Sequence, residues 1–464
     1  MSEQQSTDVD LVVVGLGPGA ESLATGAAAA GLRVVAVDKH LVGGECPYYG
    51  CVPSKMMLRA ADSLAEARRV SQLSGEVQVV PSWAPVARRI SEEATSGWDD
   101  QIAVQRLEDA GVTFHHGVGR LDGPGRVVVT LPDGATRAYE AARGVVLNPG
   151  TRPAELPIEG LAGTPYWTNR EAVQATELPG SMIVVGGGPI GAEMAQVFQR
   201  FGVRVTLLEA GPRILGPDEP EAAQVLEEVF VEEGMRVMTG VEITSVSHAD
   251  GGFEVTLGSG DTLRADKLLL AAGRTPNLDD IGLETVGLDP QARTVEVDEH
   301  LRAGERLWVI GDVTGKGAFT HVAMYQSAIA LGDITGQDGP PAQYHAVPHT
   351  TFTDPEVGGV GLTEEQAREA GLRVRVGTAP MESSSRGWLH GPGGRGLVKV
   401  VEDADRGVLV GATAMGPSGG EVLGFLAVAV HAEVPVETLQ QMIYAYPTFH
   451  RTIETALGAL EETR

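Results

Sequence analysis

The chain has 464 residues, and at roughly 150 residues per domain it is long enough for about three domains. It carries 35 basic and 62 acidic side chains, and the net charge of −27 disfavours nucleic acids and anionic membranes as partners. Hydrophobic residues make up 42% and charged residues 21% of the chain, so its composition is that of a globular protein, not a disordered one.

The first ten residues are polar and acidic, so they lack the basic and apolar segments of a secretory signal. The sequence contains no run of 18 apolar residues that would predict a transmembrane helix. It has two cysteines, too few for a disulfide-rich secreted scaffold. We therefore expect a cytoplasmic protein.

The first predicted unit is a β-α-β segment from Val12 to Asp38, in which a Gly-rich turn and a helical pattern separate two apolar runs. A shift without gaps places it on a second such segment from Ile183 to Glu209. One glycine motif is a weak signal, but two copies, each with flanking strand patterns and an acid 23 residues after the first glycine, are a strong one. We expect each unit to bind a dinucleotide.

Each motif position in these units has a physical reason. The first glycine permits the tight turn, and the second lets the backbone approach a pyrophosphate at the helix N-terminus. The third small residue keeps the helix close to the sheet, and the terminal acid can accept hydrogen bonds from ribose hydroxyls. The predicted cofactor-binding residues are Gly15, Gly17, Pro18, Ala20 and Asp38 in the first unit and Gly186, Gly188, Gly191 and Glu209 in the second.

The terminal acid of the second unit also bears on the choice of nicotinamide cofactor. A carboxylate at Glu209 suits a ribose 2′-hydroxyl and repels a 2′-phosphate, which favours NADH over NADPH. Arg213 follows in the next turn and could offset a 2′-phosphate, or it could be a solvated loop cation.

Both cysteines lie in the segment Gly43–Lys55, directly after the first unit. Residues five apart in a regular helix point about 140° apart, but Pro47 and Gly50 break that regularity and could let the sulfurs of Cys46 and Cys51 meet. A metal site would need further ligands nearby, and a structural disulfide would close a very small loop. A redox-active pair beside a flavin needs only two thiols and an electron source, and it fits best next to two dinucleotide sites.

Shorter elements follow the two units. Alternating patterns predict a strand at Phe253–Leu257, and a buried strand at Leu307–Asp312 precedes a helix over residues 320–332. A linker is expected at residues 334–343, followed by a further unit of strands and a helix. We interpret the Gly-rich segment His390–Gly396 as a hairpin loop.

Together these motifs resemble the class I pyridine nucleotide-disulfide oxidoreductases, a flavoprotein family that includes glutathione reductase, dihydrolipoyl dehydrogenase and mercuric reductase. The resemblance runs from about Asp10 to Leu457 and includes both glycine fingerprints and the cysteine segment. Four further motifs follow in the family's order: NPGTRP at 148–153, AAGRTPN at 271–277, IGD at 310–312 and FTDPEVGGVGLTE at 352–364.

The resemblance implies an α/β fold with two Rossmann-like dinucleotide-binding domains and a C-terminal α+β dimerisation domain. FAD would bind residues 1–150 and 276–343, NAD(P)H would bind residues 151–275, and residues 344–464 would form a homodimer. The resemblance places Asp312 on the ribityl chain of FAD, and Gly150, Gly273 and Arg274 are further expected cofactor-binding residues.

The resemblance also implies catalytic roles. Cys51 would be the thiolate next to the flavin, and Cys46 would be the interchange thiol that meets the substrate. Lys55 and Glu193 match a Lys–Glu pair beside the flavin, although Lys55 by itself is as plausibly a surface residue. Electrons would pass from NADH through the flavin to the disulfide, after which Cys46 attacks an acceptor by thiol exchange.

One segment departs from the family pattern. Disulfide reductases of this family carry a His–Pro sequence near the C-terminus and a Glu four positions later, whereas Tyr446 and Arg451 occupy those places here. A phenol is a poor base at neutral pH, but it can donate a hydrogen bond to a quinone or an anion. His450 and Glu454 could form a displaced acid/base pair, or His450 could be structural, and Tyr444 and Tyr446 could be packing aromatics.

The sequence thus predicts an FAD-dependent enzyme that passes electrons from NADH through a cysteine pair to a small molecule. The acceptor could be a disulfide, as in dihydrolipoyl dehydrogenase. It could instead be a quinone or another non-disulfide molecule, because the usual His–Glu pair is replaced. A non-catalytic flavin-binding redox sensor is a third alternative, against which the intact glycines, acids and cysteines argue.

Overall fold

The computed structural model describes residues 6–462, so the first five residues of the polar N-terminal start lie outside the described residues. The chain divides into two compact units, which we describe separately. The first unit contains the described residues up to Pro53 together with residues 88–154 and 274–344, and the second contains residues 54–87, 155–273 and 345–462.

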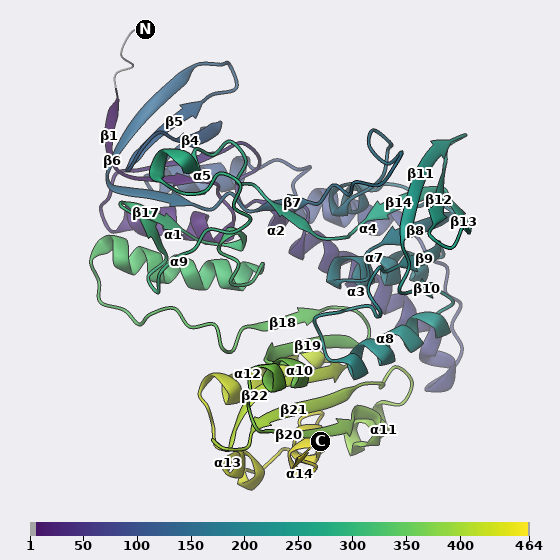
Figure 1. The fold of residues 1–464 in the computed structure, drawn as a ribbon. Coiled ribbons are helices and arrows are strands. Elements are labelled where there is room, and N and C mark those ends of the chain that lie inside the picture. Colours follow the sequence, from purple (N-terminus) through teal and green to yellow (C-terminus); the bar gives the residue numbers. More distant parts are fainter. Residues whose placement is uncertain (1–5, 463–464) are drawn as a thin grey trace. The chain divides into compact units, whose positions relative to one another are not determined.

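A mostly parallel sheet forms the centre of the first unit (Figure 1). Its strand order is β16 (Arg302–Gly304), β17 (Leu307–Val309), β6 (Thr136–Leu147), β1 (Thr7–Val14), β2 (Val34–Asp38) and β3 (Thr113–His116). The strands from β17 to β3 run parallel, and β5 (Arg126–Thr130) pairs antiparallel with β6 and with β4 (Val118–Leu121). Because the central strands are covered on both faces, the second half of β1 (residues 11–14) and most of β2 are continuous apolar runs.

Two helices of the first unit pack against each other beside this sheet. α1 (Pro18–Ala29) begins after Gly17, and α9 (Thr320–Thr335) lies along it (Figure 1). A Cβ atom at Gly19 would collide with the carbonyl group of Ala323, so glycine permits the close approach of the two helices. α9 is longer than predicted and includes the start of the expected linker.

The second unit repeats the β-α-β arrangement on a smaller parallel sheet. The strand order is β10 (Arg236–Met238), β9 (Arg204–Leu208), β8 (Ser181–Val185) and β14 (Lys267–Leu270). α7 (Pro189–Arg200) follows β8, and α8 (Pro220–Glu232) precedes β10. A separate antiparallel sheet contains β11 (Ile243–Ala249), β12 (Gly252–Leu257) and β13 (Thr262–Ala265). Both predicted β-α-β units are therefore present.

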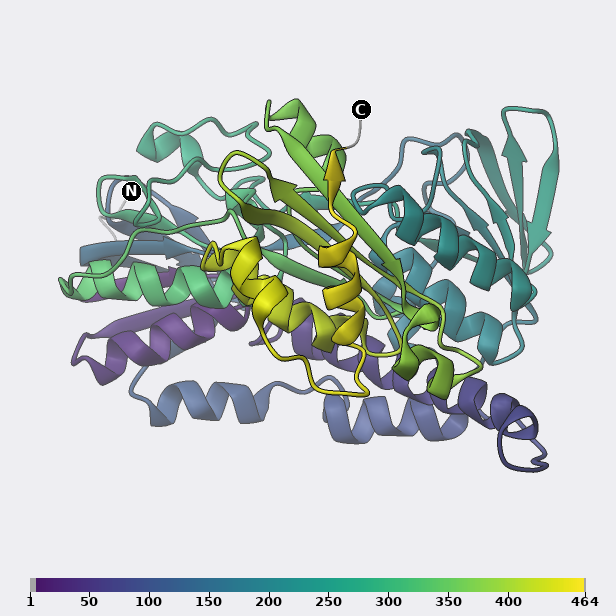
Figure 2. The ribbon, with the colours of Figure 1, turned by 90° about the horizontal axis from the view of Figure 1, so that it is seen from below.

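A six-stranded antiparallel sheet forms the C-terminal part of the second unit. Its order is β18 (Pro348–Thr351), β19 (Glu356–Gly361), β22 (Val408–Gly416), β21 (Leu397–Asp403), β20 (Val374–Pro380) and β23 (Glu461–Glu462). α12 (Gly419–His431) and α14 (Arg451–Gly458) bury Leu426 and Ile453 in one core cluster with Val398 and Val400 of the sheet. Figure 2 shows these yellow C-terminal helices lying across the strands.

The Gly-rich segment His390–Gly396 is not a simple hairpin loop. β20 and β21 are antiparallel neighbours, but the chain between them also forms a 3-10 turn (Met381–Ser383) and α11 (Ser385–His390). The side chain of Ser384 accepts a hydrogen bond from the backbone N–H of Gly387 at 3.0 Å, which caps α11. The cap stabilises a helix in the connection, so the prediction of a hairpin is wrong.

The cysteine segment forms two consecutive helices. α2 (Glu45–Tyr48) contains Cys46, and the long helix α3 (Cys51–Arg69) begins with Cys51.

Within residues 6–462, no helix has both the length and the apolar character needed to cross a membrane.

Candidate active site

The terminal acids of the two β-α-β units make the same hydrogen bonds. Asp38 Oδ2 accepts from the backbone N–H of Leu16 at 2.6 Å, and Glu209 Oε2 accepts from that of Gly187, also at 2.6 Å. The second oxygen of each carboxylate accepts from the backbone N–H two residues further along, at 2.7 and 2.6 Å. Each acid thereby ties the glycine turn to the end of the second strand. Each carboxylate oxygen still has a lone pair for a ribose hydroxyl.

Glycine is required sterically at both turns. Gly15 has a φ of 86°, and a Cβ atom there would overlap the carbonyl group of Asn148. Gly186, with a φ of 105°, meets the same kind of backbone obstruction. Gly17 and Gly188 stand at the N-termini of α1 and α7 without a capping side chain, so the first N–H groups of both helices are accessible to a phosphate.

The remaining predicted turn residues lie in the first turns of the same helices. Pro18 begins α1, and Ala20 is completely buried against the sheet side of that helix. A Cβ atom at Gly191 of α7 would overlap the carbonyl group of Gly186. The small residues therefore let each helix begin immediately next to its glycine turn.

Asp312 follows β17 at the start of a short 3-10 turn (Asp312–Thr314). Its Oδ2 accepts a hydrogen bond from Thr151 Oγ1 at 2.6 Å. Arg274 donates from Nε to the same hydroxyl at 2.7 Å and from Nη2 to the carbonyl of Thr151 at 2.8 Å. The sequence analysis missed Thr151 as a partner of Asp312, although its place in the motif NPGTRP was an available signal.

The two predicted residues Gly150 and Gly273 immediately precede short strands. β7 (Thr151–Pro153) and β15 (Arg274–Pro276) pair antiparallel with each other in the first unit. The φ angles of Gly150 and Gly273 are 66° and 105°, a region that favours glycine. These two glycines therefore let the chain turn sharply into the paired strands that hold Asp312.

The cysteine segment runs close to the first glycine turn. A Cβ atom at Gly44 would stand 3.2 Å from the Cα atom of Gly17. Cys46 is half-buried, whereas Cys51 is exposed, and its Sγ lies 3.5 Å from the Oγ1 atom of Thr320 at the start of α9. Nothing in the sequence pattern marked Thr320 as a neighbour of the cysteines.

Lys55 and Glu193 form an ion pair within the second unit. Lys55 Nζ donates to both carboxylate oxygens of Glu193, at 2.8 and 3.0 Å. The Glu193 side chain is 5% exposed, and it also accepts a hydrogen bond from the backbone N–H of Phe352 at 2.9 Å. A buried carboxylate without a partner is costly, so the ion pair with Glu193 holds Lys55 against α7. Lys55 is therefore not the unpaired surface residue that the sequence analysis gave as an alternative.

The segment that departs from the family pattern precedes α14. Tyr446 is 70% exposed and is followed by a cis peptide bond, and the guanidinium of Arg451 lies 5.7 Å from the centre of its ring. Glu454 pairs with Arg451 at 2.8 Å. Within residues 6–462, a displaced acid/base pair of His450 and Glu454 is therefore not formed.

Tyr444 is a packing aromatic. It is buried in the core of the C-terminal sheet, and its hydroxyl donates a hydrogen bond to the carbonyl of Leu439 at 3.0 Å. Burial raises the pKa of Tyr444 to about 12, so it keeps its proton at physiological pH. Of the two tyrosines, Tyr446 is the one accessible to a ligand.

Two dinucleotide-binding turns, a cysteine segment against one of them and a buried Lys–Glu pair define a dinucleotide-dependent redox protein. Residues 9–327 match the family described as pyridine nucleotide-disulphide oxidoreductase, and residues 347–457 match the dimerisation domain of that family. The chain belongs to the class I pyridine nucleotide-disulphide oxidoreductases, whose members depend on FAD and NAD(P)H. The predicted family and fold class are confirmed.

The names of the matched relatives state two different reactions. A dihydrolipoyl dehydrogenase of Chlorobaculum tepidum is 33% identical over 97% of this chain and 97% of its own length. A mercuric reductase of Streptomyces lividans is also 33% identical, over 98% of this chain and 96% of its own length. The crystal structure of LpdA from Mycobacterium tuberculosis superposes with a TM-score of 0.86 at 28% identity, covering 97% of this chain and 99% of that one. The comparisons establish that the chain belongs to a disulfide oxidoreductase family. They do not distinguish its substrate, because a dihydrolipoyl dehydrogenase and a mercuric reductase are equally identical to it.

Proposed function

We propose that the protein is an NADH-dependent reductase that passes electrons through Cys46 and Cys51 to a small disulfide. The relatives named dihydrolipoyl dehydrogenase support a dithiol/disulfide couple as the substrate, although their name states the oxidation of the dithiol, which is the reverse of the proposed reaction. The observation that supports this best is the cysteine segment, which runs against the glycine turn of the first unit. The proposal includes a cytoplasmic location and the division into FAD-binding residues 1–150 and 276–343, NAD(P)-binding residues 151–275 and dimerisation residues 344–464.

FAD fits the residues of the first unit. The turn at Gly15 has no room for a side chain, and the N-terminus of α1 is open to a pyrophosphate. Asp38 would hold ribose hydroxyls, and Asp312, oriented by Thr151 and Arg274, would hold the ribityl chain. When bound, FAD would take up electrons from the nicotinamide and make them available to the cysteines.

NADH fits the second unit better than NADPH. Both carboxylate oxygens of Glu209 accept backbone hydrogen bonds, so the negative charge is held where a 2′-phosphate would approach. Arg213 Nη2 donates to the carbonyls of Gly216 and Asp218 at 2.7 and 3.3 Å, which turns this guanidinium toward its own loop. Its buried Nε makes no hydrogen bond, so the preference for NADH is assigned to the carboxylate of Glu209 and not to Arg213.

The proposed thiol exchange uses the two cysteines in sequence. The Cys46 thiolate attacks one sulfur of the acceptor disulfide, and the other sulfur leaves and takes up a proton. The Cys51 thiolate then attacks Cys46 Sγ, which re-forms the Cys46–Cys51 disulfide and releases the second thiol. Thr320 Oγ1, 3.5 Å from Cys51 Sγ, would donate a weak hydrogen bond to the Cys51 thiolate.

A quinone reductase is the second candidate function, and Tyr446 favours it. The phenol is exposed and lies beside the cation of Arg451, where it could donate a hydrogen bond to an oxyanion. A phenol is a weaker general base than an imidazole, so a tyrosine at the position of the family's histidine lowers the expected rate of disulfide exchange.

One set of kinetic measurements distinguishes the two candidates. Turnover of NADH is measured with lipoamide, glutathione disulfide and a naphthoquinone for the wild type and for Cys46→Ser. A disulfide reductase loses roughly 100-fold or more of its disulfide turnover in Cys46→Ser, because the attacking thiol is absent. Quinone turnover that exceeds disulfide turnover and survives in Cys46→Ser would support the quinone reductase instead. A colourless protein that cannot take up FAD would refute both.

The role of Tyr446 is tested with a matched pair of variants. Tyr446→Phe removes the hydroxyl proposed to donate to a quinone, and we expect roughly tenfold lower quinone turnover with unchanged reduction by NADH. Tyr166→Phe removes a half-buried hydroxyl of the NAD(P)-binding region and should leave both rates unchanged. Equal rates in both variants would remove Tyr446 from the mechanism.

The cofactor preference is tested by the ratio of kcat/KM for NADH and NADPH. We expect Glu209→Ala to lower the preference for NADH over NADPH by roughly tenfold, because the carboxylate that repels the 2′-phosphate of NADPH is lost. Glu177→Ala removes an exposed carboxylate before β8 and serves as the control. A wild type that prefers NADPH would contradict this part of the proposal.

The homodimer is also proposed. The match to the dimerisation domain supports it, and several strongly exposed apolar side chains of this domain would be covered by a partner subunit. They include Trp388 at 76%, Val428 at 65% and Ile443 at 94% exposure. A monomer at micromolar concentration in light-scattering measurements would argue against it.

A further inference from the structure

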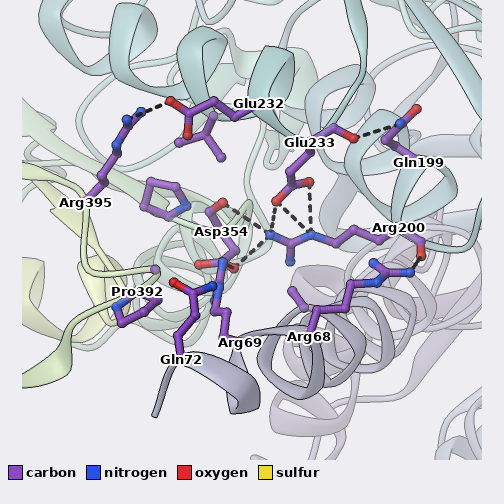
Figure 3. A pocket seen from close by; sticks show the side chains of 14 residues that line it. Arg68, Arg69, Gln72, Gln199, Arg200, Glu232, Glu233, Asp354, Pro392 and Arg395 are labelled. Carbon is purple, nitrogen blue, oxygen red and sulfur yellow. Dashed lines mark hydrogen bonds and ion pairs between the residues drawn. The ribbon is translucent and has the colours of Figure 1, made fainter. Parts of the chain in front are cut away.

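A cavity of about 620 Å³ lies within the second unit, and none of its lining residues belongs to the proposed redox machinery (Figure 3). Its walls come from the end of α3 and the 3-10 turn after it, from the ends of α7 and α8, from residues 354–355 before β19 and from the Gly-rich segment His390–Gly396. This volume is in the usual range for small-molecule sites. The Gly-rich segment has no assigned role so far.

Four arginines line this cavity in a chain that is otherwise strongly acidic. Two of them, Arg200 and Arg69, are neutralised by carboxylates. Arg200 is 2% exposed and donates to Glu233, Asp62 and Asp354 at 2.5 to 2.8 Å. Arg69 donates to Asp354 at 2.8 Å. These side chains are held by carboxylates of the protein and are not available for a ligand.

The other two arginines have donors that remain unused. Arg68 donates to the backbone carbonyl of Arg200 at 2.7 Å, and within residues 6–462 no carboxylate lies within ion-pair distance of it. Arg395 Nη2 donates to Glu232 at 2.7 Å, but its buried Nη1 makes no hydrogen bond and stands 3.8 Å from Glu228. A buried guanidinium N–H without a partner is costly. The Arg395 side chain is 42% exposed, and its rotation would let an anion in the cavity supply that partner.

Gln72 extends this set of donors. It follows Arg68 by one helical turn and lines the same cavity (Figure 3), and in the described part of the chain its side-chain amide makes no hydrogen bond. A guanidinium fork, a second guanidinium N–H and an amide are the donors that suit a phosphate group. The carboxylate of Glu232, on the opposite wall, could accept from hydroxyl groups of the same molecule.

We propose that this cavity binds the phosphate group of a small phosphorylated molecule through Arg68, Gln72 and Arg395. The volume is far larger than a phosphate ion, so a hydroxylated organic part fits beside it. The phosphate could be free or esterified, and both forms share the same recognition chemistry. The proposal is independent of the redox function, because it concerns binding and not turnover.

Isothermal titration calorimetry of the FAD-loaded protein tests this proposal. The probes are inorganic phosphate, glucose 6-phosphate and glucose, at constant ionic strength and with saturating NAD⁺ to occupy the second dinucleotide site. We expect saturable binding of glucose 6-phosphate, and at least roughly tenfold weaker binding in Arg68→Ala and in Gln72→Ala. Saturable binding of inorganic phosphate with the same loss in both variants would support recognition of the phosphate group itself.

The control is Arg88→Ala, which removes an exposed cation of α4 (Ala84–Arg89) outside the cavity and should bind like the wild type. Arg68 and Gln72 are both exposed, so their variants are expected to fold, and unchanged NADH turnover would verify this. The proposal is overturned if neither glucose 6-phosphate nor inorganic phosphate binds saturably, if glucose alone binds equally well, or if Arg68→Ala binds with wild-type affinity.

Discussion

Replacing Arg200 by methionine should strongly destabilise the second unit. The guanidinium is almost completely buried, and it bridges Asp62 on α3, Glu233 at the end of α8 and Asp354 before β19. Methionine fills part of the volume but leaves these carboxylates without their shared cation. Removing one partner of a buried ion pair costs about 3–5 kcal/mol, so we expect a loss in that range.

The loss should depend on pH in a defined direction. Burial by itself would raise the pKa of Asp354, but Arg200 and Arg69 hold it below its usual value. A carboxyl with a lowered pKa stabilises the fold above its unfolded pKa, and this contribution is lost as the pH falls through the folded value. Without Arg200 the pKa of Asp354 rises, so ionisation at pH 8 opposes folding, and protonation relieves the cost in acid. The destabilisation should therefore be larger at pH 8 than at pH 5.5.

Urea unfolding of the FAD-loaded protein at both pH values, followed by circular dichroism, measures this effect. Arg204→Met is the matched control, because Arg204 is an exposed arginine at the start of β9 and its loss should change stability by less than about 0.5 kcal/mol. If Arg200→Met lies within about 1 kcal/mol of the wild type at pH 8, the ion-pair argument fails. A larger loss at pH 5.5 than at pH 8 would contradict the assigned direction.

Three further predictions concern other buried or constrained groups. Gly15→Ala should abolish FAD retention, measured by absorbance after gel filtration, because its Cβ atom meets backbone; Gly31→Ala, at a similar φ of 87° but in open space, should retain FAD and lose only about 1 kcal/mol. Lys399→Met should lower stability in urea by about 3–5 kcal/mol, because the buried Glu219 loses its partner at 2.9 Å, and a loss below about 1 kcal/mol would refute this. Burial raises the pKa of Asp62 to about 6, so its stabilising contribution is complete below the unfolded pKa of about 4 and is lost as the pH rises through 6. The free energy of unfolding of Asp62→Asn should therefore rise relative to that of the wild type as the pH increases from 4 to 7. The expected rise is less than about 1 kcal/mol, because the side chain is partly exposed. A difference between variant and wild type that does not change with pH would refute the reasoning.

The sequence by itself determined the two dinucleotide-binding units. Their signal is local, because the glycines, the helix and the terminal acid follow one another along the chain and each obeys a short-range backbone or hydrogen-bonding requirement. Asp38 and Glu209 illustrate this, since both bond to the backbone of their own glycine turns. The cysteine spacing was informative for the same reason.

Only the tertiary structure decided which distant residues meet. Cys51 contacts Thr320 across a long stretch of chain, and no sequence pattern predicted this contact. The family resemblance had implied the Lys55–Glu193 pair, but the spacing of these two residues along the chain does not predict it. The same holds for the unused donors of Arg68 and Arg395, because pairing with a carboxylate depends on which helices the fold places side by side. Local patterns follow from backbone chemistry, whereas ion pairs and cavities follow from packing between elements, which a linear sequence does not display.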